Sequence, residues 1–232
     1  ENGFAGGGIN TQDAFHIVAT DQAQVDLNLV NTPTTNLFFN AQQRGLFAAL
    51  QTGAVLNFNN TNGDMSINTM NAIAVAVANP GSVANLNIQG TPMNNSGETG
   101  FLWFVSDSGT VNATINNSSL DSSGAGGVQG SGIFGVATTG GMANLNLTST
   151  PVTNALDDAV FVVATDLGTT VNATFDASPL DNAGQSALDL TFLNGAAGIF
   201  TLVNGSTGVN AGLDAVHILA DGVAGGVNTS LT

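Results

Sequence analysis

The sequence contains no cysteine, no tyrosine and no lysine, and its one arginine is Arg44. Without cysteine, neither disulfides nor thiolate metal sites can form. Without lysine, Schiff-base chemistry, P-loop phosphate binding and lysine–asparagine crosslinks are excluded. The 16 Asp and Glu residues give a formal net charge of −15. Nucleic acid and anionic membrane surfaces are therefore excluded as partners, because binding to phosphate groups requires clustered Lys and Arg.

Long apolar runs are also missing, since no stretch reaches the length of about 18 residues needed to span a bilayer. We therefore expect no membrane insertion. The chain opens at Glu1 without the basic and apolar regions of a secretion signal, which is typical of a mature or excised piece. With 43% hydrophobic residues in 232, we expect one domain over residues 1–232. In this division, residues 1–13 form an N-terminal loop or joint segment and residues 14–232 form the repeats.

Internal repetition is the strongest pattern that is present. Residues 101–115 recur as residues 160–175, which places the equivalent Asp107 and Asp166 59 positions apart. A second series of Leu-Asn-Leu or Leu-Asn-Ile triplets begins at Leu27, Leu86 and Leu145 with the same spacing. Because the two series interleave, the unit is about half as long. The sequence predicts about eight coils of 27–32 residues that start near residues 14, 46, 73, 101, 133, 160, 188 and 215.

Each unit combines short strand patterns with polar turns. In residues 111–115, Val-Asn-Ala-Thr-Ile, apolar and polar residues alternate, which indicates a half-buried strand. No 3.6-residue periodicity with helix caps extends over a useful length, so we expect little or no helix. A propeller blade requires about four strands per unit, whereas two or three strands fit the coil of a solenoid. We therefore predict an all-β, single-stranded parallel β-helix, or β-solenoid.

Stacked coils place equivalent residues about 4.8 Å apart along the axis, and one such column is almost entirely Asn. We expect its side-chain amides to hydrogen-bond from coil to coil, as in cross-β ladders. The predicted ladder consists of Asp26, Asn57, Asn85, Asn112, Asn144, Asn172 and Asn228. A second polar column lies two residues farther along each strand, at Asn28, Asn59, Asn87, Thr114, Asn146, Thr174 and Ser230.

The repeated coils and the Asn- and Thr-rich composition resemble the parallel β-helix arrays of large secreted bacterial and archaeal surface proteins, such as filamentous adhesins and matrix fibres. This resemblance implies an extracellular or cell-surface location and a non-enzymatic structural subunit of a fibre or filament. The partner would be a second copy of the chain, joined laterally or head to tail. The alternative is an adhesin or glycan-binding passenger segment of a larger surface protein, with glycans as its partner.

The first strand of each unit is apolar at every position, as in residues 73–78, 101–105, 133–137 and 160–164. One face of these strands must form the interior, and the other would be exposed in an isolated solenoid. We assign Ile17, Val75, Trp103 and Val162 to the exposed face, as a candidate interface. Lateral contact with another chain, coverage by the loop at residues 37–39, and a ligand groove are the alternatives.

The chain ends suggest an axial contact, because they are in phase with the repeat and carry no obvious cap. The alternatives are that the 232 residues are cut from a longer array or that loops cap the ends. The two histidines, His16 and His217, occupy equivalent positions in the first and last units. If copies stacked head to tail, these residues would become neighbours, and protonation would alter the joint. We therefore include both in the candidate interface, beside the alternative that each is a tolerated replacement in an aromatic column.

No residue pattern points to catalysis, and we predict no enzyme activity and no cofactor. Asp21, Asp107 and Asp166 recur after the first strand of a unit, and Asp121 and Asp181 recur after the second. Stacked carboxylates could hold Ca²⁺, but alternate coils lack the acid at the first of these positions. The other interpretation is that these residues form turns through their side chains.

Overall fold

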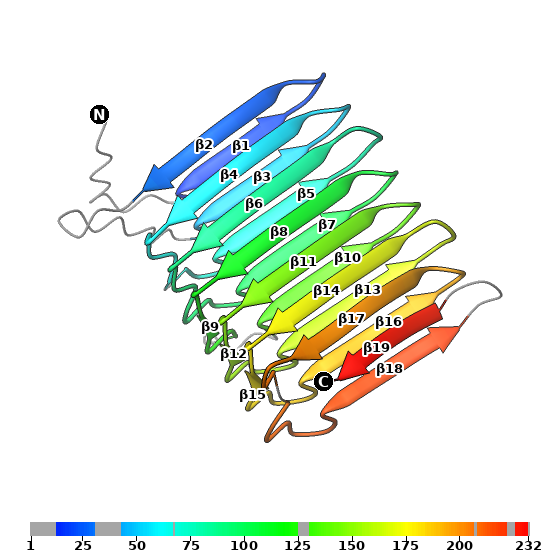
Figure 1. Ribbon diagram of the computed structural model, residues 1–232. Coiled ribbons are helices and arrows are strands. Elements are labelled where there is room, and N and C mark those ends of the chain that lie inside the picture. Colours follow the sequence, from blue (N-terminus) through cyan, green and yellow to red (C-terminus); the bar gives the residue numbers. More distant parts are fainter. Residues whose placement is uncertain are drawn as a thin grey trace.

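The regular structure of this chain consists of strands alone, in a computed structural model that describes residues 13–30, 43–66, 68–124, 130–206, 208–221 and 226–231. The strands stack side by side into two long parallel layers (Figure 1). The described residues contain no helix, and so none that could cross a membrane. Residues 1–12 of the predicted N-terminal segment and the loop at residues 37–39 lie outside the described residues.

The first layer, sheet 1, contains the first strand of every coil. In the described part of the chain it has eight parallel strands, and its order follows the sequence. These strands are β1 (Phe15–Ala19), β3 (Leu46–Leu50), β5 (Ile73–Val77), β7 (Phe101–Val105), β10 (Ile133–Ala137), β13 (Val160–Thr165), β16 (Leu188–Leu193) and β18 (Val216–Asp221).

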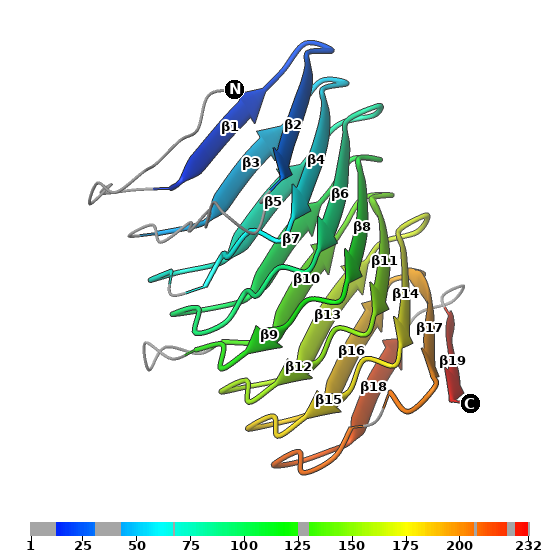
Figure 2. The same ribbon diagram turned by 60° about the vertical axis from the view of Figure 1, so that its left-hand side comes forward.

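The second layer, sheet 2, contains the second strand of every coil and is also parallel. Its described strands are β2 (Gln24–Val30), β4 (Val55–Thr61), β6 (Val83–Gln89), β8 (Thr110–Asn116), β11 (Met142–Thr148), β14 (Thr170–Asp176), β17 (Ala197–Val203) and β19 (Gly226–Leu231). A short third sheet lies at one corner in three central coils (Figure 2), and consists of β9 (Leu120–Asp121), β12 (Val152–Thr153) and β15 (Leu180–Asp181).

The strand register confirms the predicted repeat. Leu46 pairs with Ile73, 27 residues farther along the chain, and Phe101 pairs with Ile133, 32 residues farther along. These are the two ends of the predicted range of coil lengths. The described strands of each sheet are joined by about seven turns of the chain, so the all-β parallel solenoid is confirmed.

The corner between the two sheets uses a left-handed backbone. Asp21, Asp107 and Asp166 have φ values of 56°, 49° and 79°, a region that Asp and Asn tolerate better than other non-glycine residues. Asn79 and Asn194 occupy the same corner in other coils, with φ values of 74° and 53°. These three acids therefore lie in the corner turns, at positions where the backbone is left-handed.

The core is the narrow space between the sheets, filled by inward side chains from the first seven coils. Trp103 and Phe101 are among the largest of them and are fully buried. The indole of Trp103 fits because its partner in the next coil is Gly135, where a Cβ would collide with the six-membered ring. At this position the smallest residue of one coil thus makes room for the largest residue of its neighbour.

Candidate functional site

The predicted Asn ladder forms on the outward face of sheet 2. The Nδ2 atom of each ladder amide donates to the Oδ1 atom of the residue one coil nearer the N-terminus. The N···O distance is 2.6 Å from Asn57 to Asp26 and 2.9 Å from Asn85 to Asn57. It is 3.0 Å from Asn112 to Asn85, 3.0 Å from Asn144 to Asn112 and 3.1 Å from Asn172 to Asn144. Asp26 suits the accepting end, because a carboxylate has no proton to donate.

The ladder stops at β17, where the equivalent residue is Ile199. Ile199 is 54% exposed, and the buried Oδ1 atom of Asn172 has no hydrogen-bond partner. Asn228 follows Ile199 in the backbone register, but its side chain lies outside the described part of the structure. The hydrogen-bonded part of the ladder therefore extends over six coils, from Asp26 to Asn172.

The second polar column completes this outward face. Among the side chains that the structure describes, its one direct amide contact runs from Asn59 Nδ2 to Asn28 Oδ1, at 2.6 Å. Between the two columns lies a shallow depression of about 380 Å³. Amides and hydroxyls line it, from residues that include Asn112, Thr114, Asn144, Asn146 and Thr174. The face is thus a regular, uncharged polar surface along the middle of the solenoid.

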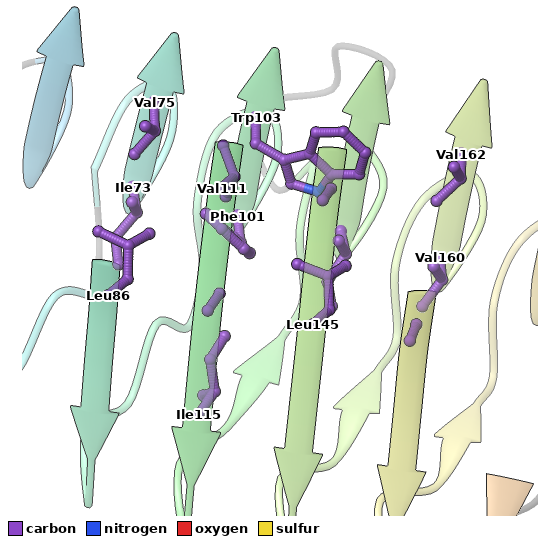
Figure 3. Close-up of a cluster of buried hydrophobic side chains, with 14 of the residues drawn as sticks. Ile73, Val75, Leu86, Phe101, Trp103, Val111, Ile115, Leu145, Val160 and Val162 are labelled. Atoms are coloured by element: carbon purple, nitrogen blue, oxygen red, sulfur yellow. The ribbon is translucent and has the colours of Figure 1, made fainter. Parts of the chain in front are cut away.

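The outward face of sheet 1 is not the one that the sequence analysis assigned. Val75, Trp103 and Val162 are 1%, 0% and 0% exposed and point into the core (Figure 3). Ile17 is half-buried and packs against the same core. The assignment was wrong by one residue, because a strand that is apolar at every position carries no alternation to fix which residues face inward.

The outward residues of sheet 1 are nevertheless mostly apolar. Val18 and Phe104 are 64% and 42% exposed, and most of the others are half-buried against one another. Phe134 packs against Phe104 at 6.1 Å between ring centroids and stacks on Phe161 at 5.3 Å. We call this surface the apolar face, and it consists of Val18, Phe47, Ala49, Ala74, Ala76, Leu102, Phe104, Phe134, Val136, Phe161 and Val163.

Polar groups lie at the two ends of the apolar face. At the N-terminal end, Asp13 accepts a hydrogen bond from His16 at 2.8 Å and pairs with Arg44 at 3.4 Å. The Arg44 guanidinium carbon lies 4.9 Å from the centroid of the Phe47 ring.

At the C-terminal end, His217 and Asp189 are 3.0 Å apart, and this hydrogen bond raises the pKa of His217. Both predicted histidines therefore point outward from sheet 1. They lie at opposite ends of one column.

The recurring acids do not gather into a metal site. Thr139 Oγ1 donates to Asp107 Oδ1 at 2.9 Å, and the Thr139 backbone N–H points to Asp166 Oδ2 at 3.4 Å. Asp121 accepts hydrogen bonds from Thr153 and from Asn154. No group of three or more His, Asp or Glu side chains in the described residues could hold a metal ion.

A buried column of hydroxyls at the corner after sheet 2 was missed in the sequence. The Thr91 backbone N–H donates to Ser118 Oγ at 3.0 Å, and the Thr150 N–H donates to Ser178 Oγ at 3.0 Å. Each hydroxyl also donates to a backbone carbonyl, as from Ser178 to Asp176 at 3.0 Å. The Thr-Pro repeat at Thr91 and Thr150 could have predicted this column. The buried Thr and Ser hydroxyls hydrogen-bond to the backbone groups that the turn leaves unpaired.

Asp158 is a buried carboxylate that lies two residues before β13. Asp158 is 6% exposed, and its Oδ1 atom accepts a 2.8 Å hydrogen bond from the Ser186 backbone N–H. Burial raises the pKa of Asp158 because it penalises the charged form, and this effect outweighs the hydrogen bond. Asp158 therefore holds the corner in place at some cost in stability near neutral pH.

Comparison with known proteins assigns no family to this solenoid. No protein-family model matches the chain, no curated protein matches it significantly, and no solved structure matches it significantly. The parallel β-solenoid is established by its strand order and register, whereas no relative identifies the chain as an adhesin or a matrix fibre.

Proposed function

We propose that this chain is a non-enzymatic structural subunit of an extracellular fibre or cell-surface filament. The observation that carries the proposal is the apolar face of sheet 1. A contiguous apolar surface on a soluble protein usually marks an interaction site, because water contact with it is unfavourable. Phe104, which is 42% exposed, lies near its centre between the outward residues of β5 and β10. The lateral self-association of copies would bury this surface, and a head-to-tail contact would join their ends.

The strands at the ends of the stack support an axial contact. In the described residues, β1 and β18 each have a single neighbour in sheet 1. The inward residues Val216 and Ile218 of β18 are each 39% exposed, whereas their partners Leu188 and Leu190 are 1% and 0% exposed. A further parallel strand placed on β18 would cover them, and β1 of a second copy presents the matching register.

Electron microscopy and sedimentation of the purified chain test this function. We expect elongated particles that grow with protein concentration. They should also grow as ionic strength rises from about 0.01 to 1 M, since screening then weakens repulsion between copies of charge −15. A chain that remains monomeric at all concentrations and salt levels would contradict the proposal.

A second candidate function is a glycan-binding segment of a larger adhesin, and the polar face of sheet 2 favours it. The depression between the two columns offers amide and hydroxyl groups from Asn112, Thr114 and Asn146, which can pair with sugar hydroxyls. This function predicts saturable binding on a glycan array. Replacing Asn146, which is exposed, should weaken that binding without changing the sedimentation of the chain.

A further inference from the structure

We infer that two copies of this chain pair face to face through the apolar face, with their solenoid axes antiparallel. This inference rests on the proposed assembly function and specifies its lateral contact. The two-fold axis would run parallel to the strands and pass between β7 and β10, the two central strands of sheet 1. Each strand would then face its counterpart from the opposite half of the second sheet, so that β5 faces β13 and β3 faces β16.

The shape of the face supports this arrangement. The small side chains of Ala49 in β3 and Ala76 in β5 leave a hollow, a depression of about 240 Å³ that is bordered by Phe104 and Val136. Phe161 and Val163 of β13 form a ridge in the other half. In the antiparallel pair, the ridge of each copy lies over the hollow of the other. Close packing of this kind is what stable interfaces require.

The other two-fold arrangement, with parallel axes, fits poorly. Each strand would then face the same strand of the second copy. Ala74 would lie opposite Ala76 and leave a void, while Phe161 would lie opposite Val163 and hold the sheets apart. Packed sheets are separated by about 10 Å, so the same spacing cannot serve both ends.

The charges at the ends of the face also favour antiparallel axes. Arg44, the only cation besides the histidines, lies over Phe47 at β3. Asp189 is the outward residue of β16 and is paired within its own chain to His217, at 3.0 Å. The antiparallel pair brings Arg44 of one copy toward Asp189 of the other, at both ends of the contact. Parallel axes would bring the two Arg44 side chains together instead.

The size of the contact fits a specific but moderate association. Eight strands about 4.8 Å apart and about 17 Å long give a footprint of about 650 Å² for each copy. The total of about 1,300 Å² lies at the lower end of the range for specific protein interfaces. We therefore expect a dimer that dissociates on dilution.

Two measurements test the pairing in the full chain. Phe161→Asp places a charge on the ridge, and Asn146→Asp places the same charge on the outward face of sheet 2. By sedimentation, Phe161→Asp should weaken the dimer about tenfold or more, and Asn146→Asp should leave it unchanged. Circular dichroism checks that both variants are folded. An unchanged dimer in folded Phe161→Asp would overturn the inference, even if the filaments of the proposed function still form.

Cysteine crosslinking tests the direction of the axes, since the chain has no cysteine of its own. In the antiparallel pair Ala76 of one copy faces Val163 of the other. The double variant Ala76→Cys/Val163→Cys should therefore yield a covalent dimer on oxidation, whereas each single variant should not. Covalent dimers from Ala76→Cys alone, or none from the double variant, would overturn the antiparallel arrangement. A chain that sediments as a monomer throughout would reject both this pairing and the proposed function.

Discussion

Replacing Asn144 with alanine tests whether the ladder stabilises the solenoid. Asn144 donates to Asn112 at 3.0 Å and accepts from Asn172 at 3.1 Å, so the variant Asn144→Ala removes two side-chain hydrogen bonds. A hydrogen bond of this kind contributes about 0.5 to 1.5 kcal/mol net. We expect the free energy of unfolding to fall by about 1 to 3 kcal/mol relative to a substitution that breaks no ladder bond.

Asn146→Ala is the matched control for that comparison. Asn146 lies in the same strand, β11, points outward on the same face, and is exposed. Both variants therefore make the same chemical change in the same strand. Their difference isolates the ladder hydrogen bonds from the general effect of replacing Asn by Ala in a strand.

Urea unfolding followed by circular dichroism measures this difference. With an m-value of about 2 to 3 kcal/mol/M, the midpoint of Asn144→Ala should lie roughly 0.3 to 1.5 M below that of Asn146→Ala. The two m-values should agree, which shows that the same cooperative unit unfolds. Equal midpoints would refute the reasoning, because the stacked amides would then contribute no more than exposed ones.

Three further substitutions probe other parts of the solenoid. Ile199→Asn should stabilise the chain in thermal unfolding, by supplying a donor to the unpaired Oδ1 atom of Asn172. Gly135→Ala should destabilise it by about 1 to 3 kcal/mol in urea, and combining it with Trp103→Phe should cost less than the sum of the two changes. Asp158→Asn should raise the Tm at pH 7. Because burial raises the pKa of Asp158, the wild-type chain loses stability as pH rises above the ordinary carboxyl pKa near 3.9. In a series of thermal scans between pH 4 and 7, the Tm of the variant should therefore fall less than that of the wild-type chain.

The coil length and the ladder could be predicted because stacking imposes a strict physical rule on the sequence. Every coil must return to the same place, so Leu27, Leu86 and Leu145 recur at equal intervals as inward residues of sheet 2. The outward residues beside them include the Asn column, whose identity repeats because each amide needs another amide as its partner. Because residues in successive coils must match one another, the repeat can be recognised in the sequence alone.

The orientation of sheet 1 could not be predicted for the opposite reason. In β7, the sequence Phe-Leu-Trp-Phe-Val is compatible with either face inward, since both faces avoid water. The deciding contact was Trp103 beside Gly135, because the glycine leaves room for an indole only inside the coil. Such a contact joins residues 32 positions apart and becomes visible only when the register of the coils is known.

The two outward faces differ in how their side chains are satisfied. On sheet 2, Asn112 and the other ladder amides hydrogen-bond to one another along the axis. On sheet 1, Phe104 and Phe161 pack against Phe134 in the neighbouring coil. These contacts cover the sides of the rings, and the outer surface of each ring stays in contact with water. A solenoid can repeat indefinitely without ever burying that face. Burial requires a second layer, and the hollow at Ala76 shows where a second copy's ridge at Val163 would fit. In the proposed assembly, the ladder would hold the coils of one copy together along the axis, and the apolar face would join two copies across it.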